Sequence, residues 1–279
     1  MAKITASLVK ELREQTGAGM MDCKKALVKA DGDFEAATKI LMEMGLAAVA
    51  KRADRATENG SVFTKITADK AVILELTCET DFVANNADFK NLGAEMCNVI
   101  LEKGYTEIND DLTNMVKALI AKIKENMGIK QFTVCDLSDN GFAASYIHDG
   151  GVKGAMVEFK ANKKEAFDVP EIKAFANGCA MHITAYTPQY LSTADVDSEK
   201  IAELTDIFSK QAEGMGKPAK IIPNIVKGMI KKHFDQICFL NQAYVMDDKL
   251  SVGEKAKAVG KAAGFELEIT GYQLFTTGK

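Results

Sequence analysis

Apolar side chains recur every three to four residues through the first 45 positions, and this period predicts three short helices. The first predicted helix ends at the glycines of residues 16–19, and the second ends at the turn of residues 31–33. The third carries its apolar residues from Phe34 to Met44 and ends at Gly45. A small unit of three helices is therefore expected at the start of the chain.

The pattern changes after this unit. Small and charged residues alternate over residues 46–60, which is typical of a partly helical linker. Farther along, the order strand, turn, strand, helix occurs twice, which predicts a duplicated α+β core. The first copy is expected to have strands at 62–67, 71–77 and 131–136, with helices at 87–103 and 110–126. The second is expected to have strands at 142–147, 154–159, 237–245 and 265–275, with helices at 170–186 and 252–263.

Residues 198–234 interrupt the second copy with two apolar faces at helical spacing, joined by the loop Gly214-Met215-Gly216-Lys217-Pro218. We predict an antiparallel helical hairpin there, with Pro223 as the first residue of its second helix. Two helices bury little core of their own, so their exposed stripe is expected to pack on another chain or domain. The predicted parts are a three-helix unit at 1–50, a linker at 51–60, core subdomains at 61–140 and at 141–197 with 235–279, and the inserted hairpin at 198–234.

The stretch Thr80-Asp81-Phe82-Val83-Ala84 joins an apolar strand to a helix. Such a junction lies at the surface, because a strand this apolar is buried and the chain turns outside the core. An acid and an aromatic ring are then presented side by side. This pair suits insertion into a partner, where the ring fills a pocket and the carboxylate competes for cations or hydrogen bonds. The local alternative is that Asp81 caps the helix and Phe82 packs beneath it.

Other positions are also candidates for contact with a partner. Met20 and Met21 lie beside the glycine loop, where thioether side chains form an adaptable surface, although at least one of them is expected in the helical core. Lys24 places a cation near them that suits an acidic partner, or it simply lies on a solvated face. His148 lies in a turn with Asp149 and two glycines, where a side chain has little core to join.

Composition narrows the function classes. The chain has 279 residues, 47% of them hydrophobic, and a formal net charge of −4, which argues against a protein that mainly binds nucleic acid. Six scattered cysteines without a C-x-x-C pair, and only three histidines, indicate buried thiols in a reducing compartment and no metal site. No apolar run approaches the roughly 18 residues of a membrane span, and the first residues lack the features of a signal peptide. A cytoplasmic protein without membrane attachment is expected.

No hydrolase, metallopeptidase, dinucleotide or Walker signature is present, so we predict that the chain is not an enzyme and uses no cofactor. Cys179 and His182 lie three residues apart on one predicted helix. Cys179 fits the buried face of that helix, and His182 fits a structural hydrogen-bonding role. The alternative is a thiol hydrolase, which requires a cysteine with a lowered pKa.

Three blocks of the sequence are similar to one family. They are residues 4–13, residues 16–27 and the Thr80–Ala84 stretch, with further likeness at residues 180–183 and 216–218. On these residues the chain resembles the bacterial elongation factor Ts family over nearly its whole length. The N-terminal unit resembles the ubiquitin-associated domain, a small three-helix bundle.

The family resemblance implies a guanine-nucleotide exchange factor for elongation factor Tu, the GTPase that delivers aminoacyl-tRNA. By position, Asp81 and Phe82, between Thr80 and Val83, would enter the GTPase domain of the partner and disturb its Mg²⁺ and phosphate region. The resemblance also implies partner contacts at Met20, Met21, Lys24 and His148, and dimerisation through residues 198–234. The alternative is an adaptor that binds through residues 1–50 alone and for which Phe82 is dispensable.

Overall fold

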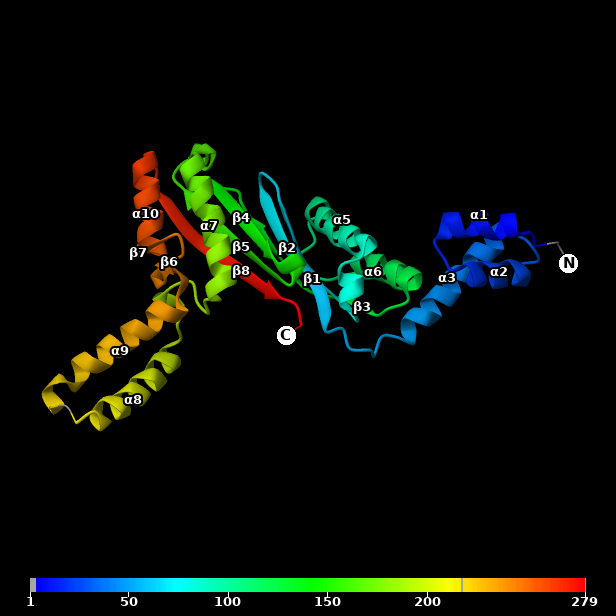
Figure 1. Cartoon of the computed structure of the whole chain (residues 1–279). Coiled ribbons are helices and arrows are strands. Elements are labelled where there is room, and N and C mark those ends of the chain that lie inside the picture. The colour runs from blue at the N-terminus through cyan, green and yellow to red at the C-terminus, as the bar shows by residue number, and fades with distance from the viewer. Residues whose placement is uncertain (1–3, 217, 279) are drawn as a thin grey trace.

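Two three-stranded antiparallel sheets form the centre of the molecule (Figure 1), described here for residues 4–216 and 218–278 of a computed structural model. The first has the strand order β1-β2-β3, with β1 at Asn59–Ile66, β2 at Lys70–Cys78 and β3 at Met127–Asp136. The second has the order β4-β5-β8, with β4 at Gly141–His148, β5 at Lys153–Ala161 and β8 at Leu267–Thr276. In both sheets the second strand along the chain lies in the middle, in agreement with the predicted duplicated α+β core.

The sheets pack face to face because their central strands are apolar on both sides. Side chains alternate along a strand, so Val72 and Leu74 of β2 pack against helices. Ala71 and Ile73 point the other way, into a core shared with Met156 of β5. Burial on both faces explains why β2 is a nearly continuous apolar run in the sequence.

Each central strand breaks its register once, next to a glutamate. The pairing of β2 with β3 shifts between Glu75 and Leu76, and that of β5 with β8 shifts after Glu158. Glu75 is fully buried, and its carboxylate accepts a hydrogen bond from the Gln131 amide at 2.8 Å. The Cys135 thiol of β3 donates to Glu158 at 3.0 Å, so this hydrogen bond crosses from one sheet to the other.

Helices cover the outer face of each sheet (Figure 1). On the first sheet lie α5 (Ala87–Lys103) and α6 (Asp110–Ile123), and on the second lie α7 (Pro170–Tyr186) and α10 (Val252–Ala263). The centre therefore has four layers in the order helix, sheet, sheet, helix. The helix predicted over residues 110–126 is three residues too long, because Lys124 takes a left-handed conformation that ends α6.

The N-terminal unit consists of α1 (Ala6–Thr16), α2 (Met20–Lys29) and α3 (Phe34–Ala50). Its buried core is formed by Val9, Leu12, Cys23, Ala26, Leu27 and Ala37. The predicted end of the third helix at Gly45 is wrong, since α3 continues to Ala50. A glycine inside a helix costs only about 1 kcal/mol relative to alanine. Here it also allows close approach to α6, because a Cβ at Gly45 would lie 3.1 Å from that of Ala121.

The inserted hairpin consists of α8 (Ser198–Gly214) and α9 (Ile222–Ile237), and it lies at the opposite end of the molecule from the N-terminal unit (Figure 1). Leu204 and Phe234 pack in its base. Pro223 is the second residue of α9 and not, as predicted, the first. The missing N–H of proline is harmless there too, because the first N–H groups of a helix have no acceptor within the helix. Lys217 of the predicted loop lies outside the described residues.

The strand predicted over residues 237–245 is also wrong. α9 runs to Ile237, a 3₁₀ turn follows, and only β6 (Ala243–Tyr244) forms a strand, paired with β7 (Asp247–Ser251). A short apolar run cannot by its period distinguish a strand from the buried end of a helix. The 3₁₀ turns lie at Asp149–Gly151, Lys164–Asp168, Thr193–Asp195, Ala219–Ile221 and Phe239–Asn241. None of the helices in the described ranges has the length and apolar character to cross a bilayer.

Candidate partner-binding site

The stretch with the acid and the ring forms a single helical turn, α4 (Asp81–Ala84), between the end of β2 and the start of α5. Thr80 begins this turn, and its hydroxyl accepts a hydrogen bond from the backbone N–H of Val83 at 3.3 Å. Val83 and Ala84 are buried in the core between the first sheet and its helices. One face of the turn is therefore fixed in the interior, and the other face carries Asp81 and Phe82.

Phe82 is 83% exposed, more than any other large apolar side chain in the described ranges. Asp81 beside it is exposed as well. The local alternative for this pair is wrong, because Thr80 caps α4 and Asn86 caps α5, so Asp81 is not needed as a cap. Phe82 does not pack beneath the helix either, since Val83 takes the inward position of the turn. An exposed ring on a fixed turn contributes little to folding and is available for contact.

Hydrogen bonds and an ion pair fix the two residues that precede this turn, Glu79 and Thr80. The Thr80 hydroxyl donates to the Glu125 carboxylate at 2.9 Å, and the Glu79 carboxylate accepts from the backbone N–H of Asn126. Arg55 pairs with Glu79 at 3.3 Å. Because Glu125 and Asn126 follow α6, the turn is fixed by three elements, β2, α5 and the α6–β3 connection. Sequence reasoning missed Glu79, Glu125 and Asn126. Glu79 lies far along the chain from the adjacent residues Glu125 and Asn126, and the three form no recognisable motif.

Met20 and Met21 begin α2, with 44% and 62% of their surfaces exposed. The expectation that at least one of them belongs to the helical core is wrong, because Cys23, Ala26 and Leu27 form the buried face of α2. Lys24 is exposed on the same helix. These three side chains lie on the N-terminal unit and are not joined to Phe82 by any contact within the described residues.

His148 ends β4 and is exposed, with its Nδ1 atom 3.4 Å from the Tyr146 hydroxyl. The turn after it packs on the first sheet, because a Cβ at Gly151 would lie 2.7 Å from the Ser61 hydroxyl oxygen. Ser61 in β1 pairs with Leu76 in β2, only a few residues before Thr80. The structure therefore brings the His148 turn and the Thr80–Ala84 turn to the same end of the paired sheets.

The remaining chemical candidates are structural. All six cysteines are buried, and burial raises the pKa of Cys78 and of Cys97 to about 12. Burial also raises the pKa of Cys179, which is the opposite of what a thiol hydrolase needs. His182 is buried, its Nε2 lies 2.9 Å from the Gln242 side-chain oxygen, and its Nδ1 accepts from a backbone N–H. Its role is therefore the structural one that the sequence predicted.

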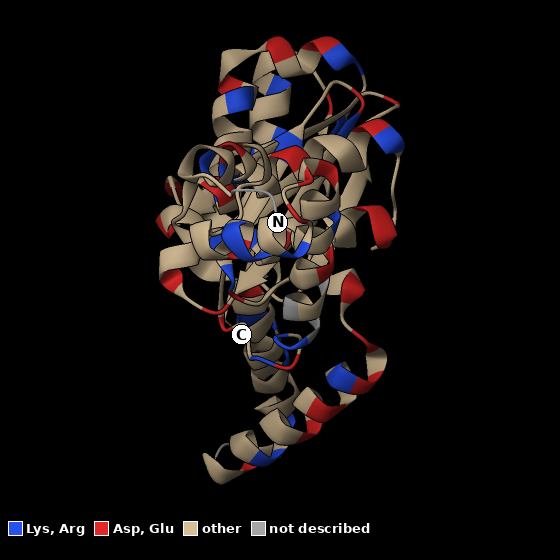
Figure 2. Cartoon of the chain, turned by 90° about the vertical axis from the view of Figure 1, so that its right-hand side faces the viewer, with Lys and Arg blue, Asp and Glu red and all other residues tan. Residues whose placement is uncertain are grey.

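Charges are mixed on the end of the molecule that carries the N-terminal unit. Figure 2 shows Lys and Arg interspersed with Asp and Glu along the ribbons of this face. Within residues 4–216 and 218–278, no group of three or more His, Cys, Asp or Glu side chains has the arrangement of a metal site. The candidates for partner contact are an exposed ring and an acid on α4, and thioethers and single cations elsewhere on the surface.

Comparison with known proteins gives one consistent result. The sequence signature of the family described as Elongation factor TS matches residues 79–279. A protein of Treponema denticola named elongation factor Ts is 43% identical over 275 residues, which cover 99% of this chain and 98% of that protein. Proteins of the same name from Borreliella burgdorferi and Desulfovibrio desulfuricans are 39% and 37% identical, with coverage of 100% and 98% of both chains. The chain therefore belongs to the elongation factor Ts family, and with it to the elongation factors of protein biosynthesis.

Proposed function

We propose that this chain accelerates GDP release from elongation factor Tu by inserting Asp81 and Phe82 beside the Mg²⁺ and phosphates of the bound nucleotide. Membership of the elongation factor Ts family implies the coarser statement, nucleotide exchange on elongation factor Tu in translation elongation. One observation supports the finer statement most directly. The 83% exposed Phe82 side chain stands on a turn whose opposite face is buried.

The ring and the carboxylate have different tasks in this mechanism. The Phe82 ring enters an apolar pocket of the partner, where its burial offsets the cost of displacing the groups already there. Asp81 brings a negative charge toward the nucleotide phosphates and their Mg²⁺. Because Mg²⁺ bridges phosphate and protein oxygens, disturbing its coordination removes a large charge interaction that holds GDP.

Exchange then follows from the reciprocity of binding. If the chain binds the nucleotide-free partner more tightly than the GDP-bound partner, it weakens GDP binding by the same factor. This requires no bond-making chemistry in the chain itself. We accordingly propose that it is not an enzyme and that it holds no nucleotide, metal or cofactor of its own.

Further contacts position the partner. Met20 and Met21 adapt to an apolar patch of elongation factor Tu, with Lys24 near an acidic group, and His148 makes a separate contact. We assign these contacts to three parts of the chain, residues 1–50, 61–140 and 141–197 with 235–279, with residues 51–60 as the linker. The complex is placed in the cytoplasm, without direct contact to nucleic acid or membrane.

The α8–α9 hairpin, within residues 198–234, is proposed as a surface for homodimerisation. Ile207, Met215 and Ile221 are 46%, 48% and 41% exposed there, although the base of the hairpin is well packed. Ile207→Asp is expected to lower the apparent mass in sedimentation equilibrium if the surface is used. An apparent mass that is the same for both proteins would contradict this role.

The mechanism is tested by stopped-flow release of a fluorescent GDP analogue from elongation factor Tu, with and without Mg²⁺. Wild type is expected to accelerate release strongly at millimolar Mg²⁺ and much less after chelation, because the ion it displaces is then already absent. Asp81→Asn should weaken the acceleration only when Mg²⁺ is present. Equal acceleration under both conditions would refute the Mg²⁺-directed mechanism and leave exchange itself in place. No acceleration by folded wild type would favour the adaptor that binds through residues 1–50.

A further inference from the structure

Three consecutive residues after α6 contact segments that are far apart in the sequence. The Lys124 ammonium group pairs with the Asp22 carboxylate of α2 at 2.6 Å. Its neighbour Glu125 accepts the hydrogen bond from Thr80, and the backbone N–H of Asn126 donates to Glu79. The Lys124–Asn126 turn is thus joined at one end to the N-terminal unit and at the other to the turn that carries Phe82.

Lys124 occupies a position that favours glycine. Its φ of 70° and ψ of 24° are left-handed and end α6. Glycine fills the same left-handed position after α1, α5 and α10, at Gly17, Gly104 and Gly264. A side chain there costs about 1 kcal/mol, because its Cβ crowds the following carbonyl oxygen. Thr187 takes the same left-handed position after α7, so a side chain is tolerated there. At Lys124 the side chain also carries the ammonium group that reaches Asp22.

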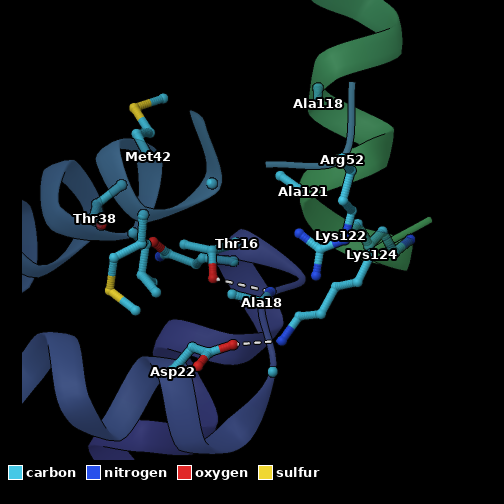
Figure 3. A pocket seen from close by; sticks show the side chains of 15 residues that line it. Thr16, Ala18, Asp22, Thr38, Met42, Arg52, Ala118, Ala121, Lys122 and Lys124 are labelled. Carbon is cyan, nitrogen blue, oxygen red and sulfur yellow. Dashed lines mark hydrogen bonds and ion pairs between the residues drawn. The ribbon is translucent and has the colours of Figure 1, made fainter. Parts of the chain in front are cut away.

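The N-terminal unit packs on α6 mainly through α3. A pocket of about 540 Å³ lies between them, lined by Thr38 and Met42 of α3 and by Ala118 and Lys122 of α6 (Figure 3). Two further residues that line this pocket, Gly45 of α3 and Ala121 of α6, mark where the two helices approach closely. The Lys124–Asp22 pair, drawn as a dashed line in Figure 3, attaches α2 of the unit to the residue that ends α6.

We propose that Lys124 is a positioning residue, whose ion pair with Asp22 sets the orientation of the N-terminal unit relative to the Phe82 turn. Met20 and Met21 begin the same helix that carries Asp22, so this pair fixes where they meet the partner while Phe82 is inserted. The inference rests on the proposed function. It adds that two contact surfaces are held in register by one turn of three residues.

The proposal predicts that Lys124 affects the affinity of the chain for elongation factor Tu but not the rate of GDP release at saturation. In stopped-flow titrations, Lys124→Glu is expected to raise the half-saturating concentration of the chain, by about two- to fivefold for a partly exposed pair. The release rate at saturation should stay the same, because the Asp81–Phe82 turn is intact. The charge-swapped protein with Lys124→Glu and Asp22→Lys should regain most of the affinity. Lys103→Glu is the matched control, since it breaks the pair with Asp111 at the other end of α6.

Lys124→Gly distinguishes positioning from a general structural role. It removes the ion pair but relieves the left-handed backbone, so the midpoint of thermal unfolding should stay the same or rise while the half-saturating concentration increases. A fall in both affinity and stability would indicate a structural role only. Unchanged affinity in Lys124→Glu, or a swap that restores nothing, would overturn the proposal.

Hydrogen exchange measures the positioning without the partner. Backbone amides of residues 16–24 should exchange faster in Lys124→Glu than in wild type and recover in the charge-swapped protein, whereas Lys103→Glu should match wild type. Equal rates of hydrogen exchange in all four proteins would overturn the inference, even if the chain accelerates GDP release from elongation factor Tu. If the wild-type chain does not accelerate GDP release from elongation factor Tu, the proposed function is overturned instead. Hydrogen exchange would still decide whether Lys124 orients the N-terminal unit.

Discussion

Truncation of Phe82 to alanine should separate partner action from folding. Because the side chain is 83% exposed and lies outside the core, Phe82→Ala should change the free energy of unfolding by no more than about 0.5 kcal/mol. The neighbouring Val83 and Ala84 keep the turn anchored in the interior. The variant is therefore expected to fold like wild type and to fail mainly in its action on elongation factor Tu.

The magnitude of that failure follows from the exposed area. A phenylalanine buries roughly 150–200 Å² on full burial, and 83% of its surface remains available to a partner. At about 25 cal/mol per Å² this corresponds to about 3–4 kcal/mol. Alanine keeps the backbone and Cβ share, so the expected loss is about 2–3 kcal/mol, equivalent to about 30- to 150-fold in the efficiency of GDP release.

The assay is stopped-flow release of a fluorescent GDP analogue over a range of concentrations of the chain. Ile108→Ala serves as a matched control, because it truncates a 45% exposed apolar side chain outside the proposed contact surface. Phe82→Leu tests the ring against apolar volume alone and should lie between alanine and wild type. Release by Phe82→Ala within threefold of wild type, with Ile108→Ala similar, would refute the insertion of Phe82.

Three further outcomes are expected. Thr80→Val should lower the rate of GDP release several-fold and cost about 1 kcal/mol of folding free energy, because it removes the helix cap and the hydrogen bond to Glu125. Thr80→Ser keeps the hydroxyl, so it should change neither quantity when both variants are measured by urea unfolding and stopped flow. None of the six buried thiols should react with Ellman's reagent at pH 8 before unfolding, and one fast thiol would restore the hydrolase alternative. Burial lowers the pKa of His182 below its usual 6.5, so the unfolded chain binds more protons below that pH. The folding free energy should be level above about pH 6.5 and fall by at most roughly 1.4 kcal/mol per pH unit below it, and a urea series of His182→Gln with the same slope would contradict this.

Element bounds were predictable where local signals mark both ends. Ser251 with Glu254 forms a capping box before α10, and Gly264 ends that helix in the left-handed conformation. Pro170 begins α7 in the same local way. The four residues of α4 are too short to show a period, and the apolar residues after Ile237 fit a strand equally well. These misses have one cause, which is that local spacing does not report which neighbours cover a segment.

The sequence allowed the residues of the candidate site to be proposed, but not the contacts that hold them in place. The sequence placed an acid beside a ring at a strand–helix junction, but the exposure of Phe82 depends on Val83 taking the inward position. The ion pair between Lys124 and Asp22 joins residues that are distant in the sequence, and each lysine or aspartate has many equivalent neighbours along the chain. Only the packing of α3 on α6 selects this pair.

The second sheet closes only after its third strand, β8 (Leu267–Thr276), has been synthesised. The first sheet is complete once Asp136 has left the ribosome. Until β8 follows, β5 has one row of backbone N–H and C=O groups without strand partners, and such an edge is prone to aggregation. Since folding proceeds from the N-terminus during synthesis, the nascent chain passes through a state with one finished half and one open strand edge.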